Sequence, residues 1–344
     1  MSDLRSMTPA PSAQVPVGLP ARDSVREWLR RQRTYLALRW VYCWGVAKFS
    51  RVRSSILLKI SGLPKIVEYQ GEFGPELVCF LPFVYFLWES GRLGDRKVKT
   101  YEGMHSYYYF IDKEQFVESD QKRTYVPSNQ RPRYFPNRDE WFATRSENEK
   151  YPDFRKKYKN DIIKYEKPIL VVSNKYCTEF GIGPLNYLST DVLDVIFREM
   201  GDDFQIIYIR QGFSRQQYGL SIDDNEVIAF DDHRSVEAAP GVITFDELMK
   251  QHEYKYDFNL LKNLIMANTY HFISTQGGGA YNFAYFDSSI ISILHKRGRE
   301  TDFAYENGFF SYASSPAPRL IVNKTDEGLL RSLSAVRRHR PAIL

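Results

Sequence analysis

The chain of 344 residues has few cysteines and no long apolar run, and both shortages limit what it can be. Its three cysteines, Cys43, Cys79 and Cys177, form no CxxC pair and join no histidine at the spacing of a metal site. This cysteine usage suits a reducing compartment, so we expect a cytoplasmic protein. Residues 1–21 lack the apolar stretch of a secretory signal and are rich in Pro, Ser and Ala, which is typical of a disordered leader.

Basic charge is concentrated near the start of the chain. Residues 22–65 contain eleven Lys or Arg and two Asp or Glu, a balance of +9, whereas the whole chain has a net charge of +5. The remainder is therefore near −4. Because no RNA- or DNA-reading motif accompanies the basic segment, we expect no nucleic acid partner.

The basic segment 22–62 also carries tryptophans and leucines, which makes an amphipathic helical segment the expectation. Its longest uncharged run, Trp40 to Ala47, is too short to cross a bilayer. Two interpretations stay open. The segment either lies on an anionic membrane surface, here the inner face of a membrane, or packs on the body of the protein with its arginines solvated.

The first half of the chain, residues 63–164, begins with the pattern of a β-α-β unit. A strand is expected over 65–70, a turn at "GEFGP" with Pro75 at the first helical position, an apolar helix bent at Pro82, and a second strand over 96–103. Two strands joined by a helix predict a parallel sheet, with ligands beyond its carboxyl ends. Glu72 on that rim is either a general base or a helix-start carboxylate.

His105 lies in the aromatic run "MHSYYYF", which we interpret as a strand. It is either a base, because an unperturbed histidine side chain has a pKa near neutrality, or a structural residue. Residues 120–136 read as a long loop. Thirteen of the twenty-three residues in 145–167 are charged, which indicates a solvated helix or hinge and puts the domain boundary near residue 165.

The second half, residues 165–325, alternates buried strands with helices. Strands are expected over 167–176, 203–212, 226–232, 271–275 and 289–296, and helices over 189–201 and 257–269. A capping box is expected at Thr244 with Glu247, and residues 326–344 form a last helix and a tail. This alternation predicts a parallel sheet covered on both faces. Two such halves make an α/β protein of two doubly wound, Rossmann-like domains that face a cleft.

The stretch "STQGGGAYN" (274–282) places three glycines between a strand and a helix. Either the turn is tight and needs positive φ, or an anion approaches bare main chain at a helix start. Polar residues at the same predicted edge favour the anion. We therefore predict a donor-binding site with these members: Asn174, Lys175, Arg210, Gln276, Gly277, Gly278, Gly279 and Asn282. No DxD motif accompanies them, so no metal is expected.

The stretch 259–298, with "GEFGPEL" at 71–77, resembles glycosyltransferases of the GT-B fold, of the polysaccharide- and lipopolysaccharide-biosynthesis type. This resemblance implies transfer of a sugar from a nucleoside diphosphate donor to a hydroxyl of a glycan or lipid-linked acceptor. It implies that Lys175 and Arg210 stabilise the leaving diphosphate. It also implies that Glu72, in preference to His105, takes the proton of the acceptor's hydroxyl. The chain lacks the E-x7-E spacing of many retaining members, which favours an inverting enzyme.

Two other functions fit the same architecture. A sugar-nucleotide epimerase would act on the free nucleotide sugar without an acceptor. A non-catalytic protein would bind a sugar or nucleotide in the same cleft. The amino-acid sequence does not distinguish these from the transferase, because the fold alone does not decide the chemistry.

Overall fold

The structure is a computed structural model, which describes residues 62–126, 148–179, 183–211, 228–298, 305 and 308–341 and six positions between 41 and 56. The predicted leader 1–21, most of the basic segment 22–62 and residues 127–136 of the predicted loop lie outside the described residues. Residues 47–344 belong to one compact unit. None of the described helices is long and apolar enough to cross a membrane.

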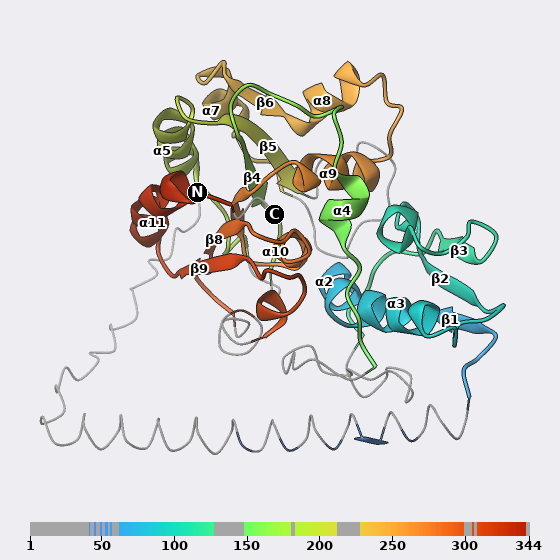
Figure 1. Cartoon of the computed structure of the whole chain (residues 1–344). Coiled ribbons are helices and arrows are strands. Elements are labelled where there is room, and N and C mark those ends of the chain that lie inside the picture. Colours follow the sequence, from blue (N-terminus) through green and yellow to red (C-terminus); the bar gives the residue numbers. More distant parts are fainter. Residues whose placement is uncertain are drawn as a thin grey trace, which may run out of the picture. The chain divides into compact units, whose positions relative to one another are not determined.

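The first of two parallel sheets has three strands in the order β1-β2-β3 (Figure 1). These strands are β1 (Ile66–Glu68), β2 (Lys97–Tyr101) and β3 (Phe116–Ser119). Its connections are α2 (Phe73–Pro75), η1 (Glu76–Phe80) and α3 (Leu81–Glu89) between β1 and β2, and η2 (His105–Tyr108) between β2 and β3. Val67 lies opposite Val98 in parallel register, which confirms the predicted β-α-β unit.

Two local predictions for this unit are wrong. The helical segment starts at Phe73, so Pro75 is its third residue rather than its first. His105 does not lie in a strand but opens the 3-10 helix η2. The bend expected at Pro82 is preceded by a π-helical turn, in which the Leu81 amide donates to the carbonyl of Glu76. Because Pro82 has no N–H, it cannot extend the normal hydrogen-bond ladder at this point.

The second sheet has six parallel strands in the order β6-β5-β4-β7-β8-β9. They are β4 (Ile169–Lys175), β5 (Gln205–Gln211), β6 (Val242–Thr244), β7 (His271–Thr275), β8 (Ile290–Leu294) and β9 (Arg319–Asn323). Numbered along the chain, this is the 3-2-1-4-5-6 order of dinucleotide-binding folds. The α/β class and the Rossmann-like arrangement of this half are therefore confirmed.

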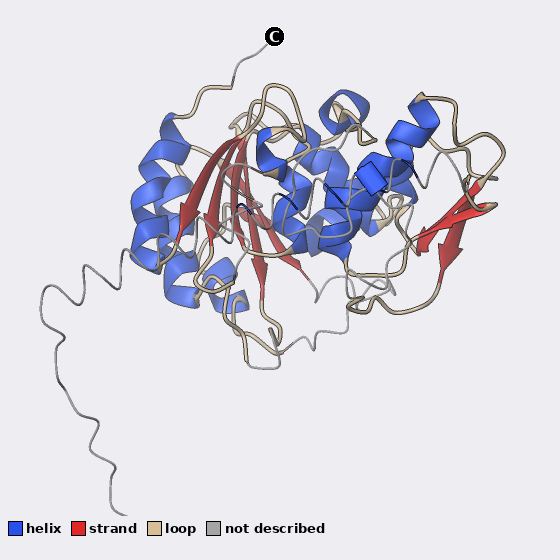
Figure 2. Cartoon of the chain, turned by 90° about the horizontal axis from the view of Figure 1, so that it is seen from below, coloured by secondary structure: helices blue, strands red, loops and turns tan. Residues whose placement is uncertain are grey.

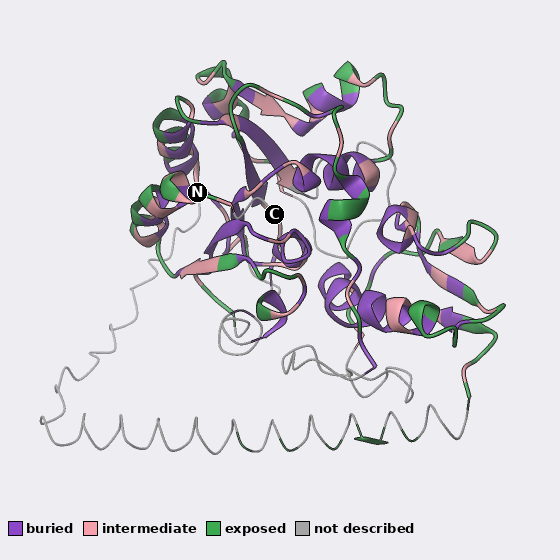
Figure 3. Ribbon diagram, in the orientation of Figure 1, coloured by how far each residue is buried: buried purple, intermediate pink, exposed green. Residues whose placement is uncertain are grey.

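Helices cover both faces of the six-stranded sheet (Figure 2). They are α5 (Thr190–Met200), α7 (His233–Glu237), α8 (Phe245–Gln251), α9 (Phe258–Ala267), α10 (Gly278–Phe283) and α11 (Asp326–Arg338). Successive residues of β4 alternate between the two faces: Leu170 and Val172 pack in the core with α5 and α11, whereas Val171 packs in the core with α8, α9 and α10. The middle strands are buried on both sides, as Figure 3 shows.

The prediction of a third strand over 226–232 is wrong for residues 228–232, the part of this range that the structure describes. Residues 228–230 are irregular, and α7 starts at His233; the third strand is β6, only three residues long. The irregular segment runs beside the sheet because the Ile228 amide donates to Tyr176 O, at 3.1 Å. The predicted helices over 189–201 and 257–269 are confirmed as α5 and α9, and the Thr244–Glu247 capping box is present.

Helices α9 and α10 pack against η2, α2 and η1 of the first sheet's unit, so one apolar core runs through both sheets. The charged connector contributes α4 (Phe154–Tyr158), which packs on α9. Phe154, Arg155 and Tyr158 are buried, so this helix is not the solvated one that its charges suggested. The boundary expected near residue 165 stays a prediction.

Candidate functional site

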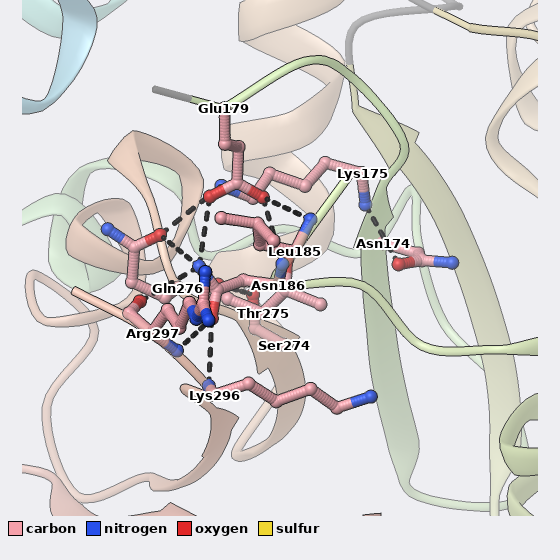
Figure 4. Close-up of polar contacts among 10 residues, drawn as sticks. All are labelled: Asn174, Lys175, Glu179, Leu185, Asn186, Ser274, Thr275, Gln276, Lys296 and Arg297. Atoms are coloured by element: carbon pink, nitrogen blue, oxygen red, sulfur yellow. Dashed lines mark hydrogen bonds and ion pairs between the residues drawn. The ribbon is translucent and has the colours of Figure 1, made fainter. Parts of the chain in front are cut away.

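The order of the six strands reverses between β4 and β7, and open α/β sheets bind ligands beyond the carboxyl ends at such a switch point. Lys175 is the last residue of β4, and Gln276 follows β7. Their side chains meet across the switch point, with Lys175 Nζ 3.3 Å from Gln276 Oε1 and 3.1 Å from Glu179 Oε2 (Figure 4). The structure thus brings two predicted site residues together.

Asn186, which sequence reasoning missed, ties the loops at this edge together. Its Nδ2 donates to Glu179 Oε2 at 2.9 Å and to Arg297 O at 3.0 Å, and its Oδ1 accepts from the amides of Lys296 and Arg297. Glu179 in turn accepts from the Asn186 amide at 2.9 Å. Asn186 is fully buried, so this network holds Glu179, and with it Lys175, in position.

More cations follow the neighbouring strands. Lys296 and Arg297 come just after β8, and Lys324 just after β9. Lys296 Nζ pairs with Asp326 Oδ2 at 2.8 Å, and Lys324 Nζ lies 3.0 Å from His295 Nδ1. We call Lys175, Lys296, Arg297 and Lys324, with the carboxylates of Glu179 and Asp326, the basic cluster; its cations outnumber its carboxylates by two. The position of "HKR" directly after a buried strand is the signal that could have found it.

Arg210 belongs to a different part of the edge. Its Nη1 lies 2.9 Å from Asp232 Oδ1, and it also donates to the carbonyls of Phe230 and Ile228. Arg210 is in register with Asn174, so it lies on the opposite face of the sheet from Lys175. The structure therefore does not place Lys175 and Arg210 around one group, as the sequence suggested.

A cavity of about 520 Å³ lies beside Arg210, at the ends of β5 and β6. We call it the β5–β6 cavity; its walls include Tyr208, Arg210, Ala229, Phe230, Asp232, His233, Val236, Glu237, Thr244, Phe245 and Asp246. Tyr208 donates its hydroxyl to Asp232 Oδ2 at 2.6 Å. Burial, reinforced by the nearby Asp232 charge, raises the pKa of Tyr208 well above its ordinary value, so the hydroxyl keeps its proton.

Asn174 and Asn282 have structural surroundings. Asn174 is buried, and its side chain accepts from the Leu188 amide at 2.9 Å and donates to Leu188 O at 3.0 Å. It thereby fixes the chain that leads into α5. Asn282 is fully buried in α10, with Nδ2 3.0 Å from Met266 Sδ of α9. Their predicted contacts with a donor stay predictions.

Two of the three glycines, Gly277 and Gly278, meet a geometric demand. Gly277 has a φ of +136°, and a Cβ there would lie 3.1 Å from Lys175 Nζ. A Cβ on Gly278 would lie 3.0 Å from the Gly74 amide nitrogen and 3.1 Å from Phe73 Cδ1. The main chains of α2 and α10 thus approach each other closely at Gly278. The phosphate-binding role of Gly277, Gly278 and Gly279 stays a prediction.

The predicted bases, Glu72 and His105, follow β1 and β2 at the carboxyl edge of the smaller sheet. Glu72 is half-buried at the N-cap of α2, where its carbonyl accepts from the Tyr69 hydroxyl at 2.8 Å. His105 Nε2 lies 3.4 Å from Ile111 O, and its ring packs on Phe116 at 5.0 Å between centroids. Among the residues that the structure describes, no contact is seen between either of them and the basic cluster, and their catalytic roles stay predictions.

Glu76 is a buried structural carboxylate. It forms an ion pair of 2.6 Å with Arg123, and both side chains are fully buried. Arg123 also donates to Gly71 O at 3.2 Å, so the pair fastens the turn that carries Glu72. Among the residues that the structure describes, no three His, Cys, Asp or Glu side chains gather as a metal site would require.

No protein-family model and no curated protein matches the chain. Similar solved structures include E. coli ADP-heptose lps heptosyltransferase II, at 10% identity and a TM-score of 0.46, over 79% of this chain and 98% of that one. The UDP-GlcNAc 2-epimerase from Methanocaldococcus jannaschii is similar at 9% identity and a TM-score of 0.33, over 86% of this chain and 75% of that one. Likeness of this degree assigns neither an activity nor a ligand.

Proposed function

We propose that the chain is a glycosyltransferase that holds a nucleoside diphosphate sugar at the carboxyl edge of its six-stranded sheet. The observation that carries this proposal is the meeting of Lys175 and Gln276 across the switch point between β4 and β7. Ligands of open α/β sheets bind at this point, and a basic edge suits a diphosphate.

In this proposal Lys175 leaves Glu179 and Gln276 and donates to the diphosphate. The bond between the sugar's anomeric carbon and the diphosphate oxygen breaks, and the acceptor's hydroxyl oxygen forms the new bond to that carbon. Negative charge grows on the leaving diphosphate, and Lys175, with Lys296 and Arg297 along the edge, stabilises it. No metal ion is part of this scheme. Glu72, or else His105, takes the acceptor's proton, and the sugar's configuration inverts.

A glycan or a lipid-linked molecule is the proposed acceptor, and an anionic membrane surface is a proposed partner. Support comes from the described positions of the basic segment, which are helical and apolar at Phe49, Val52 and Ile56. These three side chains are 71%, 60% and 49% exposed. Spacings of three and four residues put them on one helical face, as an interfacial helix requires. Sedimentation with anionic but not with neutral vesicles is the expected result.

The decisive experiment is a thermal-shift screen with UDP, GDP, CDP and ADP, followed by a turnover assay with their sugars. A nucleotide at 100 times its dissociation constant stabilises the folded protein by ~2.7 kcal/mol. Lys175→Ala should weaken the best nucleotide roughly tenfold to a hundredfold, because it removes charge-assisted hydrogen bonds. Gly278 is a poor target for this test, since any side chain there meets Gly74 whether or not a ligand binds.

Lys164→Ala is the matched control. Lys164 is exposed, and within the described part of the chain its ion pair is with Asp161 alone. This variant removes the same charge and should leave binding unchanged. Release of nucleoside diphosphate, faster with an acceptor, supports the transferase. An isomerised nucleotide sugar without release would identify an epimerase, and binding without turnover would leave a binding protein. If no nucleotide binds, the proposed function fails.

A further inference from the structure

The carboxylate of Glu179 lies in a ready-made anion site at the carboxyl edge (Figure 4). Its Oε1 accepts from the main-chain amides of Asn186, at 2.9 Å, and Leu185, at 3.4 Å. Its Oε2 accepts from Asn186 Nδ2, at 2.9 Å, and lies 3.1 Å from Lys175 Nζ. One ammonium and three N–H groups therefore converge on a single negative group, and such donors bind a phosphate oxygen as well as a carboxylate oxygen.

The ion pair between Lys175 and Glu179 is a strong competitor of any incoming anion. Both side chains are largely buried, so water and salt screen their attraction less than at an exposed pair. Glu179 is also tethered to the same chain, only four residues after Lys175, and therefore competes at a high effective concentration. An anion that approaches the site meets a lysine that is already neutralised, and it gains Lys175 only by replacing Glu179 as the partner.

We propose that Glu179 is a specificity-determining residue, whose carboxylate competes with the donor's diphosphate for Lys175 and thereby keeps small free anions, such as inorganic phosphate, out of the site. This inference rests on the proposed function. The apparent dissociation constant of a ligand rises in proportion as the binding-competent state, here the one with Lys175 free of Glu179, becomes rarer. Every anion that uses Lys175 is weakened by the same factor. A nucleotide sugar tolerates this loss because its base and sugar make further contacts, whereas inorganic phosphate has neither group.

The alternative role for Glu179 is to hold Lys175 in the position that binds the ligand. Two observations speak against it. A carboxylate 3.1 Å from the ammonium repels a phosphate that approaches the same ammonium. Gln276 Oε1, 3.3 Å from Lys175 Nζ, is a neutral acceptor that orients the lysine without cancelling its charge. The carboxylate of Glu179 is therefore not needed to position Lys175, and its effect on an anionic ligand is antagonistic.

Calorimetric titration of the full chain with ADP, GDP, CDP, UDP and inorganic pyrophosphate tests the inference. Glu179→Gln keeps the size of the side chain and one oxygen for the amides of Leu185 and Asn186, but it has no charge to offer Lys175. The best nucleotide and pyrophosphate should both bind at least about threefold more tightly to this variant, by similar factors. Glu253→Gln, which removes an exposed carboxylate paired with Lys255, is the matched control and should leave binding unchanged.

A double variant separates competition for Lys175 from a general change of charge. In the Lys175→Ala background, Glu179→Gln should change nucleotide affinity by less than about twofold, because the lysine for which the two anions compete is gone. Urea titration checks that each variant is folded, and Glu179→Ala repeats the test if Glu179→Gln is not.

Three results would overturn the inference and leave the proposed function standing. They are unchanged or weaker nucleotide binding without the Glu179 carboxylate, a gain that pyrophosphate does not share, and a gain that persists without Lys175. Absence of binding by every nucleotide, in the native chain and in Glu179→Gln alike, would instead overturn the proposed function.

Discussion

Both edges of the six-stranded sheet hold a buried or half-buried cation, but the partners of the two cations differ in kind. At the amino edge, Arg155 donates to the carbonyls of Ala267 and Thr269, at 2.6 and 2.9 Å, and to Asp287. At the carboxyl edge, Lys175 contacts the side chains of Glu179 and Gln276. The side chains of Arg155 and Lys175 are 9% and 18% exposed.

This difference separates a structural cation from one that a ligand can recruit. The carbonyls of Ala267 and Thr269 that Arg155 bonds belong to the end of α9 and to the connection between α9 and β7, so they cannot leave without moving the chain. Glu179 and Gln276 can be replaced as partners of Lys175 by a rotation of the lysine side chain alone. Burial and charge are similar at the two edges, and the origin of the acceptors decides which edge is available for binding.

The largest effect should come from Arg155→Ala. Removing one partner of a buried pair leaves the Asp287 carboxylate uncompensated and deprives three main-chain carbonyls of the guanidinium, which costs about 3–5 kcal/mol of unfolding free energy. Urea titration measures this loss, and Arg155→Lys should recover only part of it, because an ammonium cannot reach the same forked set of acceptors. Nucleotide affinity of the folded fraction should not change. A stable variant with weakened nucleotide binding would reverse the assignment of the two edges.

A residue of the amino edge should also make the unfolding free energy depend on pH. His271, the first residue of β7, lies with Nε2 3.3 Å from His339 O, and burial lowers the pKa of His271 from 6.5 to about 4. The unfolded chain therefore takes up a proton below pH 6.5 that the folded chain refuses until about pH 4. The contribution of neutral His271 is complete above pH 6.5 and is lost as the pH falls through this window, by about 3 kcal/mol in total.

Urea titrations of the native chain and of His271→Gln between pH 7 and pH 4 check this expectation. The difference in slope belongs to His271, because carboxylates titrate alike in both proteins. His233→Gln, at an exposed position of the carboxyl half, is the control and should keep the native slope. If the native protein and His271→Gln show equal slopes of unfolding free energy against pH, His271 is not a source of the pH dependence.

Features set by nearby residues were predictable from the sequence. The capping box at Thr244, the apolar face of α5 and the continuous strand β4 all appear within a few residues of chain. β6 was missed because three residues give no periodicity, and the apolar stretch 226–232, which precedes α7, was predicted as the strand instead. The Glu76–Arg123 pair joins residues 47 positions apart, which no local pattern can show.

For the site, the rule that polar residues follow strands predicted the correct edge of the six-stranded sheet. It did not predict on which face of the sheet each side chain lies. Lys175 and Gln276 were identified correctly as neighbours, whereas Arg210 was placed with them although its register puts it on the other face. Lys296 was missed because the predicted strand ran two residues too far, past Leu294. Asn186 was missed because its contacts reach loops that only the folded sheet brings together.

The smallest expected effect is the loss of stability in Lys296→Ala. Arg155→Ala should lower stability and leave nucleotide affinity unchanged, whereas Lys296→Ala should do the opposite. Lys296 is half-exposed and pairs with Asp326 through side chains only, so its loss should cost under about 1 kcal/mol of unfolding free energy. If the basic cluster receives a diphosphate, the same change should still weaken nucleotide binding several-fold, and more at low salt than at high salt, because the lost attraction is screened. Urea titration and calorimetry at two ionic strengths give both numbers from one preparation. A variant that loses stability and keeps its affinity would place Lys296 with the structural cations and leave Lys175 to hold the phosphates without it.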